Sequence, residues 1–372
     1  MQAFGLGCNP AMSDRNLKEG KRRGLRVPSA VLPTLITVAM VLAAVFLLND
    51  DGSPGVAVDE RSLTMVGDTG SGAAGRATLA GMAAANPTLH VLLGDLSADG
   101  PGSEGAWCRL VRDQLSSPVQ LVAGNDEDDS GEDGRIANFE HCLPDRMHSL
   151  GLYGREYYFD VGTLARVILI SPDLTIEGEH FFYGEGNVNQ RWLEAAIDGA
   201  RGAKIPWVIV GMHKTCISVG EYSCDVYQDL FSILIKHRVD LVVSAHDHSY
   251  QRSAQLRAGT KACPVVMVDT FARGCVSDDG RDGQYRRGQG PVFVISGAGG
   301  QDLYDVHDDD PESAYFASVM GRNSEPRSGF LRIRLRKDRL EGEFVGTTPG
   351  TFTDRFTIDA SESVSVASDQ AA

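Results

Sequence analysis

The chain has 372 residues, of which 42% are hydrophobic, and a formal net charge of −15. This length and apolar content suffice for one large α/β domain or two smaller ones. The acidic balance argues against a nucleic-acid backbone as the main partner, so we expect no nucleic-acid binding. It does not exclude a phosphorylated substrate, because bound metal ions reverse the sign of the local field.

The first 48 residues have the composition of a membrane anchor. Residues 1–26 form a polar, basic tail, and residues 27–48 are an apolar run near the roughly 20 residues that span a bilayer. The positive-inside rule places the tail in the cytoplasm and the later residues outside it. A cleavable signal peptide is the alternative, but the run is long and no small-residue cleavage site follows Leu48. We therefore expect a single-pass protein of the cell membrane with an extracytoplasmic domain.

Cysteine usage agrees with export from the cytoplasm. Six of the seven cysteines follow the expected anchor, and disulfides form in oxidising compartments. The six form three pairs of sequence neighbours, which we predict as the disulfides Cys108–Cys142, Cys216–Cys224 and Cys263–Cys275. Free buried thiols are the alternative.

The remaining chain reads as a linker, one folded domain and a tail. Residues 49–61 are rich in Gly, Pro and Asp, which predicts a linker. Over residues 62–358, short apolar runs alternate with helix-like segments, the pattern of βαβ units with a largely parallel sheet. Later runs at 265–268, 292–295 and 330–335 predict strands of a second sheet layer, the last forming a hairpin with 340–345. Residues 359–372 predict a disordered tail.

Potential metal ligands follow five of the early apolar runs. They are Asp68 after residues 63–66, Asp95 after 90–93, Asn125 after 119–123, His213 after 207–210, and His246 with His248 after 241–244. Ligands of open α/β sheets bind at the carboxyl ends of the strands. The two histidines of the last group share one side of an extended segment, although alone they fit a polar loop as well as a metal site. Carboxylates, an amide and imidazoles together suit a pair of metal ions.

The motifs around these residues resemble a known family. GDTG (67–70), GDLS (94–97), GNDE (124–127), VGMH (210–213) and AHDH (245–248) occur in the order found in the calcineurin-like metallophosphoesterase superfamily. PWVIVGMHKTC (206–216), AHDHSYQR (245–252) and VFVISGAGGQDLY (292–304) are most similar to its purple-acid-phosphatase-like branch. The resemblance covers roughly residues 62–358. It implies a four-layer α/β/β/α sandwich, whereas the residue patterns alone indicate α/β with two sheet layers.

The resemblance also implies an activity and a ligand set. The expected reaction is hydrolysis of a phosphate mono- or diester by a metal-bound hydroxide. By position, Asp95 would bridge two divalent or trivalent ions, Asp68 and His248 would complete the first site, and the second would contain Asn125, His213 and His246. These ligand types are compatible with Fe, Zn or Mn. The metals, the substrate and the oligomeric state stay open.

The chain departs from the family pattern at three positions. Asp126 occupies the place of a histidine that stabilises the transition state or protonates the leaving group, and we assign it as the candidate catalytic residue. Ala98 replaces the tyrosine ligand of purple acid phosphatases, so no charge-transfer colour is expected. Gly70 replaces a histidine found in many relatives, which leaves the first metal site with three protein ligands. These departures motivate a second hypothesis, a catalytically weakened pseudoenzyme or cell-surface binding module that retains the fold and one metal.

Overall fold

The computed structural model describes residues 59–132 and 134–360. The predicted tail at 1–26, the anchor at 27–48, most of the linker and all but the start of the tail at 359–372 lie outside these residues. Within the part of the chain that is described, no helix combines the length and the apolar character needed to cross a membrane.

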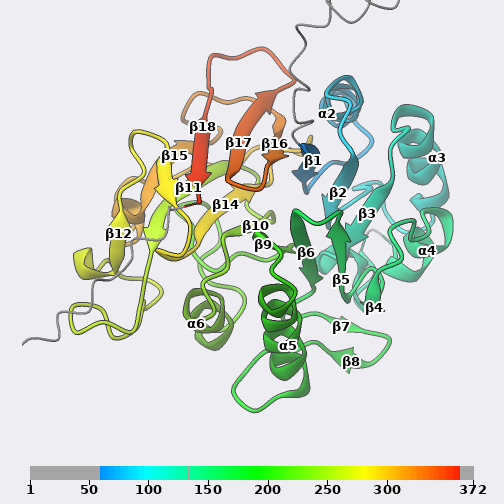
Figure 1. Cartoon of the computed structure of the whole chain (residues 1–372). Helices are drawn as coiled ribbons and strands as arrows, with labels where there is room; N and C mark the ends of the chain where they lie inside the picture. Colours follow the sequence, from blue (N-terminus) through cyan, green and yellow to red (C-terminus); the bar gives the residue numbers. More distant parts are fainter. Residues whose placement is uncertain (1–58, 133, 361–372) are drawn as a thin grey trace, which may run out of the picture. The chain divides into compact units, whose positions relative to one another are not determined.

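The first sheet contains both ends of the described chain (Figure 1). Its seven strands run in the order β13 (Gln284–Arg286), β18 (Arg355–Asp359), β17 (Arg339–Gly346), β16 (Gly329–Leu335), β1 (Arg61–Val66), β2 (Leu89–Leu93) and β3 (Val119–Val122). Strands β1, β2 and β3 are parallel, so their carboxyl ends share one edge of the sheet. Strand β16 is antiparallel to β1 and forms a hairpin with β17.

The second sheet is built around four parallel strands. Its path is β12 (Val276–Asp278), β11 (Tyr250–Leu256), β14 (Val292–Ser296), β10 (Leu241–Ser244), β9 (Trp207–Met212), β6 (Ala165–Ile170), β5 (Glu156–Val161) and β4 (Leu150–Leu152), and β15 (Phe316–Met320) pairs with β11. Strands β6, β9, β10 and β14 are mutually parallel. A separate ribbon joins β7 (Thr175–Ile176) and β8 (Glu179–His180).

Alternating side chains divide the interior into two cores. Met65 and Val91 of the first sheet share a core with Ile209 and Val243 of the second, so this core lies between the sheets. Intervening residues such as Leu92 and Val210 pack in a second core with the helices, as the two-residue period of strands requires. The helices are α2 (Ala73–Ala84), α3 (Glu104–Gln114), α4 (Ile136–Cys142), α5 (Val188–Gly202) and α6 (Gln228–Lys236).

Helix α2 contacts strand β16 of the first sheet, and α5 contacts β6 of the second. The predicted α/β fold with two packed sheet layers is confirmed.

Two strand predictions were wrong. Residues 265–268 are not a strand but part of the loop closed by the Cys263–Cys275 disulfide, and Val265 and Met267 are exposed. The run is apolar, but no strand of the described chain pairs with it. Residues 330–335 do form a strand, yet it lies in the first sheet beside β1 rather than in the second layer. Its hairpin with residues 340–345 is confirmed.

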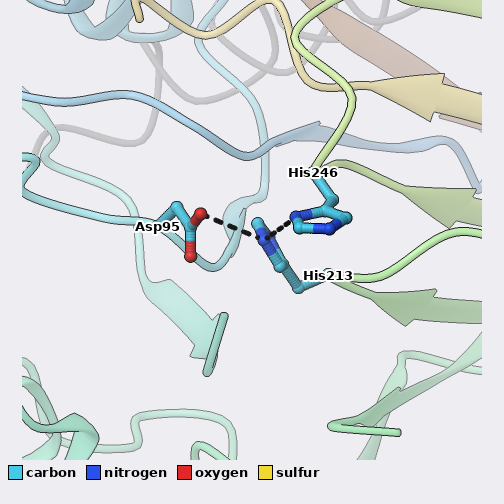
Figure 2. A group of neighbouring side chains, drawn as sticks. All are labelled: Asp95, His213 and His246. Carbon is cyan, nitrogen blue, oxygen red and sulfur yellow. Dashed lines mark hydrogen bonds and ion pairs between the residues drawn. The ribbon is translucent and has the colours of Figure 1, made fainter. Parts of the chain in front are cut away.

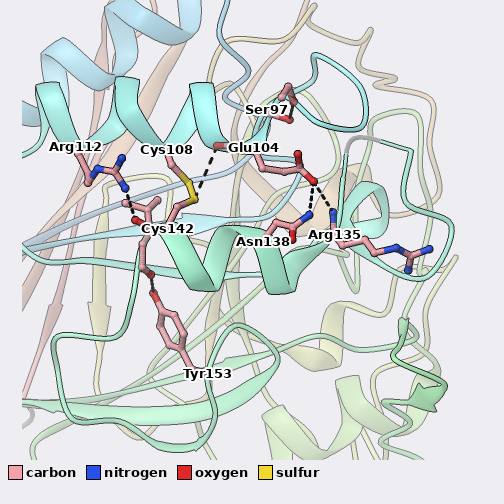
Figure 3. The surroundings of a disulfide bond; sticks show 10 residues. Ser97, Glu104, Cys108, Arg112, Arg135, Asn138, Cys142 and Tyr153 are labelled. Atoms are coloured by element: carbon pink, nitrogen blue, oxygen red, sulfur yellow. Dashed lines mark hydrogen bonds between the residues drawn. A yellow bond between two sulfur atoms is a disulfide. The ribbon is translucent and has the colours of Figure 1, made fainter.

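The Cys108–Cys142 disulfide joins α3 to the end of α4 (Figure 3). Hydrogen bonds reinforce the same junction. Arg112 donates to the Cys142 carbonyl oxygen at 2.6 Å, and the Asn138 amide donates to the Glu104 carboxylate at 2.8 Å. This disulfide and Cys263–Cys275 confirm two of the three predicted pairs.

The third predicted pair is wrong, because Cys216 and Cys224 are free thiols. Burial raises the pKa of both, that of Cys224 to about 11. The reactive thiolate is therefore scarce at neutral pH. Proximity in the sequence was the only basis for this pairing, and it does not by itself bring two sulfur atoms into bonding geometry.

Candidate metal centre

The predicted ligands lie where the two sheets meet. Asp68 and Asp95 follow strands of the first sheet, and His213 and His246 follow strands of the second. Glycines allow the close approach. A Cβ on Gly67 would lie 2.4 Å from the Ala245 Cβ, and one on Gly94 would lie 2.8 Å from His213 Nδ1.

The backbone at these turns has an uncommon conformation. Asp68, Asp95 and His246 have φ angles of 57°, 46° and 69°. Non-glycine residues rarely adopt this left-handed region, and such conformations cluster at functional sites. They turn the three side chains inward, where all are buried.

Three potential ligand atoms converge around a fourth, His213 Nε2. This atom lies 3.1 Å from Asn125 Oδ1, 3.1 Å from His246 Nδ1 and 3.2 Å from Asp95 Oδ2. Figure 2 shows Asp95 and His246 on opposite sides of the His213 ring. Among the described residues, ligand atoms of Asp95, His213 and His246 all lie within 4.8 Å of one another. Carboxylate, amide and imidazole donors at this spacing fit a single transition-metal ion.

Backbone and carboxylate acceptors fix the histidine tautomers. His213 Nδ1 lies 2.8 Å from the Leu93 carbonyl oxygen, and His248 Nδ1 lies 2.8 Å from that of Asp302. His246 Nε2 lies 3.1 Å from Asp225 Oδ2. Because carbonyls and ionised carboxylates only accept, each of these nitrogens must carry the proton. The other nitrogen of each ring is left with a lone pair, as a metal-ligating histidine requires.

Asp68 and His248 form a second, adjoining group. His248 Nε2 lies 3.5 Å from Asp68 Oδ1, and Asp68 Oδ2 accepts the backbone N–H of His246 at 3.0 Å. Asp68 is fully buried, and its Oδ1 accepts no hydrogen bond from the described residues. A buried carboxylate oxygen without a donor is costly, and a cation between it and His248 would remove that cost. These two residues therefore fit a second metal ion.

The three departures from the family pattern fall close to these groups. A Cβ on Gly70 would lie 3.4 Å from the Ala98 side chain, so the two missing ligand positions adjoin each other. Asp126 accepts the Asn125 side-chain N–H at 2.8 Å, which directs Asn125 Oδ1 toward His213. Its backbone N–H donates to Asp95 Oδ1 at 3.2 Å.

Electrostatics favour a cation at His213. Burial alone would lower the pKa of His213, but the Asp95 carboxylate raises it to about 10. The additional proton would lie on Nε2, the atom that a metal ion would occupy instead. Burial lowers the pKa of His246, so its Nδ1 lone pair stays available. The Asp225 pKa is lowered by its hydrogen bond to His246, which keeps that acceptor ionised.

Glu127 holds together the two loops that carry Asp95 and Asn125. Its carboxylate accepts the backbone N–H groups of Asp95, Leu96 and Gly124 at 2.9, 2.7 and 2.9 Å. The side chain is buried, and burial followed by the nearby Asp95 charge raises its pKa to about 8. Glu127 therefore positions the backbone of the two loops that carry Asp95 and Asn125.

Two tyrosines stack on the ligand histidines. The Tyr222 ring lies 3.9 Å from that of His246 with an interplanar angle of 17°, and Tyr304 lies 4.0 Å from His248 at 12°. The two phenol rings lie 6.0 Å from each other in an edge-to-face arrangement. Burial raises both pKa values, so the hydroxyl groups remain protonated donors. The backbone N–H of Tyr222 donates to Asp247, which fixes this loop beside the site.

All six predicted ligands therefore lie at the centre, four around one position and two beside it. The supporting residues Asp225, Glu127, Tyr222 and Tyr304 were missed. Glu127 and Tyr304 stand inside the motifs that carried the resemblance, so their positions gave a signal. Asp225 and Tyr222 lie in a loop without regular spacing, and no motif or periodicity pointed to them.

Comparisons with known sequences agree with this geometry. The calcineurin-like phosphoesterase family matches residues 62–250. An uncharacterised protein of Mycobacterium tuberculosis H37Rv is 32% identical over 197 residues, which cover 49% of this chain and 35% of that protein. The Fe(3+)-Zn(2+) purple acid phosphatase 12 of Arabidopsis thaliana is 28% identical over 163 residues, 40% of this chain and 32% of that enzyme. The chain thus spans about a third of the length of these curated relatives.

Solved structures agree on the fold. The purple acid phosphatase PPD1 from yellow lupin seeds superposes with a TM-score of 0.62 at 16% identity, over 82% of this chain and 54% of that one. A structure of PhoD gives a TM-score of 0.51 at 11% identity, over 82% and 71%. Such identities speak for the fold alone. The similarity in sequence and in fold to purple acid phosphatases confirms the resemblance to them. Because the family match covers half of the sequence, the chain belongs to the calcineurin-like phosphoesterase family.

Proposed function

We propose that this chain is a phosphoesterase that hydrolyses phosphate mono- or diesters with two metal ions. One observation carries the proposal. Three buried histidines each commit one ring nitrogen to a carbonyl or carboxylate acceptor and turn the other toward a buried aspartate or a neighbouring ligand. A structural histidine needs only one partner, whereas this arrangement is that of a metal ligand with its supporting acceptor.

The residues divide between two ions. Asp95, Asn125, His213 and His246 would hold one ion, and Asp68 and His248, with Asp95 as the bridge, would hold the other. Bound ions supply Lewis acidity that generates a hydroxide nucleophile near neutral pH and stabilise charge on the phosphoryl group. The donor set suits Fe, Zn or Mn.

Other side chains of this chain would orient the reacting groups. The Tyr222 and Tyr304 hydroxyls can donate hydrogen bonds to phosphate oxygens or to the leaving group, a task that the replaced histidine performs in relatives. Asp126 fixes the Asn125 amide through the 2.8 Å hydrogen bond. We therefore assign Asp126 a positioning role in place of the proton transfer expected from its place in the motif.

The proposed location is the outer side of a cell membrane, with the chain held by the anchor at 27–48. The basic and apolar N-terminal pattern and the two disulfides support it, because disulfides persist in oxidising compartments.

A binding module with one metal ion is the second candidate. Gly70 and Ala98, which replace two ligands of relatives, adjoin each other. Elemental analysis of the purified chain separates the candidates. Two metal ions per chain would support the phosphoesterase, and a single ion without phosphatase activity would support the binding module.

His213→Ala should remove the ion held around Nε2. We expect metal content to fall by one ion per chain and phosphatase activity to fall by more than about 100-fold, beyond the usual effect of a supporting residue. His141→Ala, at an exposed histidine, is the control. Unchanged activity of His213→Ala against a phenyl phosphate ester would refute the proposal.

Asp225→Asn should weaken metal binding without removing a ligand. Loss of the acceptor for His246 Nε2 is expected to lower metal affinity about 10- to 100-fold, measured by competition with a chelator. Asp198→Asn is the matched control, because Asp198 lies 3.3 Å from His237 in an exposed pair away from the site. Equal affinities of the two variants would contradict the supporting role of Asp225.

Substitutions at Asp126 separate positioning from proton transfer. Asp126→Asn keeps an acceptor oxygen for the Asn125 amide, so activity should be largely retained, whereas Asp126→Ala should lose it together with metal affinity. Proton transfer by Asp126 would instead make both variants equally inactive with full metal content. A gain of activity in Asp126→His from near zero would favour the decayed-enzyme hypothesis.

Tyr304→Phe keeps the ring on His248 and removes only the hydroxyl. We expect kcat to fall by about tenfold, the lower end for a hydrogen bond to a charged group, with unchanged metal content. Tyr183→Phe is the control, since this buried phenol donates to Glu156 away from the site. Identical kcat values for the wild type and Tyr304→Phe would exclude donation by this hydroxyl.

A further inference from the structure

A basic pocket of about 770 Å³ lies at the edge of the second sheet opposite the metal centre. Pro206 and Asp240, which line it, precede β9 and β10, whereas His213 and His246 follow the same two strands. Since β9 has six residues, about 20 Å separates the two edges. The cations that line the pocket are Arg201, Lys204, Arg238, Arg287 and Lys337.

Most of this positive charge is not neutralised. Arg201 is paired at 2.9 Å with Asp240, which is buried beneath it. The other four cations make no ion pair with a carboxylate among the described residues, and Asp338 is the remaining acidic residue of the lining. Arg287 is held in place over the Trp207 ring, 5.3 Å from its centre. A chain with a net charge of −15 thus presents a local positive surface here.

The chain enters the described structure beside this pocket. Strand β1 begins at Arg61, which pairs with Leu335 at the end of β16. Glu60 accepts a hydrogen bond from Arg336 at 2.7 Å, and Lys337 of the pocket is the next residue. The ten residues 49–58 between this point and the expected anchor span at most about 35 Å. The expected anchor is therefore joined to the described chain at this edge.

We propose that the basic pocket docks on anionic phospholipid headgroups of the membrane in which the chain is anchored. Each Lys or Arg near an anionic surface favours binding by about fivefold. This attraction acts within about 10 Å, so only the face that carries the cations gains from contact. Docking would leave the metal centre at the far edge, facing away from the membrane. The proposal rests on the expected anchor and is independent of the phosphoesterase activity.

Lysine acetylation of the full chain in vesicles tests the proposal. The chain is reconstituted in phosphatidylcholine vesicles with and without about one third phosphatidylglycerol, and acetylation rates are measured by mass spectrometry. Lys204 and Lys337 should be acetylated at least about fivefold more slowly in the anionic vesicles, and high salt should abolish the difference. Lys214, next to His213 at the other edge, should react equally in both. Equal rates at Lys204 in both vesicles, or equal slowing at Lys214, would overturn the proposal.

A charge-reversal variant ties the effect to the pocket. Arg238→Glu should remove most of the protection of Lys204 and Lys337, whereas Arg109→Glu on α3 makes the same charge change at an exposed residue elsewhere and should not. Inositol hexakisphosphate is added to the chain in phosphatidylcholine vesicles as a soluble anion. Protection by this anion, with none by phosphatidylglycerol, would assign the pocket to a soluble ligand and refute membrane docking. If the chain cannot be reconstituted in phosphatidylcholine vesicles, co-sedimentation of the chain with the anionic vesicles is measured instead. Binding by the wild type that is lost in Arg238→Glu would support docking through the pocket. Absence of binding by the wild type would refute it.

Discussion

The structure of the centre depends on the balance of buried negative charge. Asp68 and Asp95 are almost completely shielded from solvent, and an isolated buried carboxylate is strongly unfavourable. Hydrogen bonds from backbone N–H groups satisfy part of this demand. The rest requires positive charge at the positions that His213 Nε2 and His248 Nε2 face. The uncompensated negative charge that would destabilise the site without a cation is also what favours the binding of metal ions.

Division of the ligands between two sheets gives the site its precision. Oxygen donors come from the first sheet and imidazoles from the second, and the core between the sheets fixes their separation. Small residues at the strand ends let the loops approach, and Glu127 joins two of these loops through three hydrogen bonds. Since the ligands stand on rigid strand ends, the centre can be formed before any ion binds.

The departures from the family pattern alter one half of the centre more than the other. In the group around His213, three further ligand atoms lie within hydrogen-bonding distance of Nε2, and Asp126 supports it by orienting Asn125. The Asp68 group offers fewer donors, beside Gly70 and Ala98. The tyrosines that stack on His246 and His248 bring hydroxyl groups to the same region. Asp126 therefore stands in a region that also contains the hydroxyl groups of Tyr222 and Tyr304.

The sequence by itself determined the fold class, the placement of the six candidate ligand residues at strand ends and two of the disulfides. These features depend on local patterns. An apolar run followed by a polar residue predicts a candidate ligand at a strand end, whichever sheet contains the strand. The tertiary structure decided which apolar runs find a neighbouring strand, as the failed strand at 265–268 shows, and whether Cys216 and Cys224 are bonded. It also decided the partners of the ligands. Asp225 accepts a hydrogen bond from His246, and Tyr222 stacks on the same ring. These residues lie 21 or more positions from His246 in the sequence. The packing of the two sheets sets the geometry of such contacts, and no spacing along the chain does.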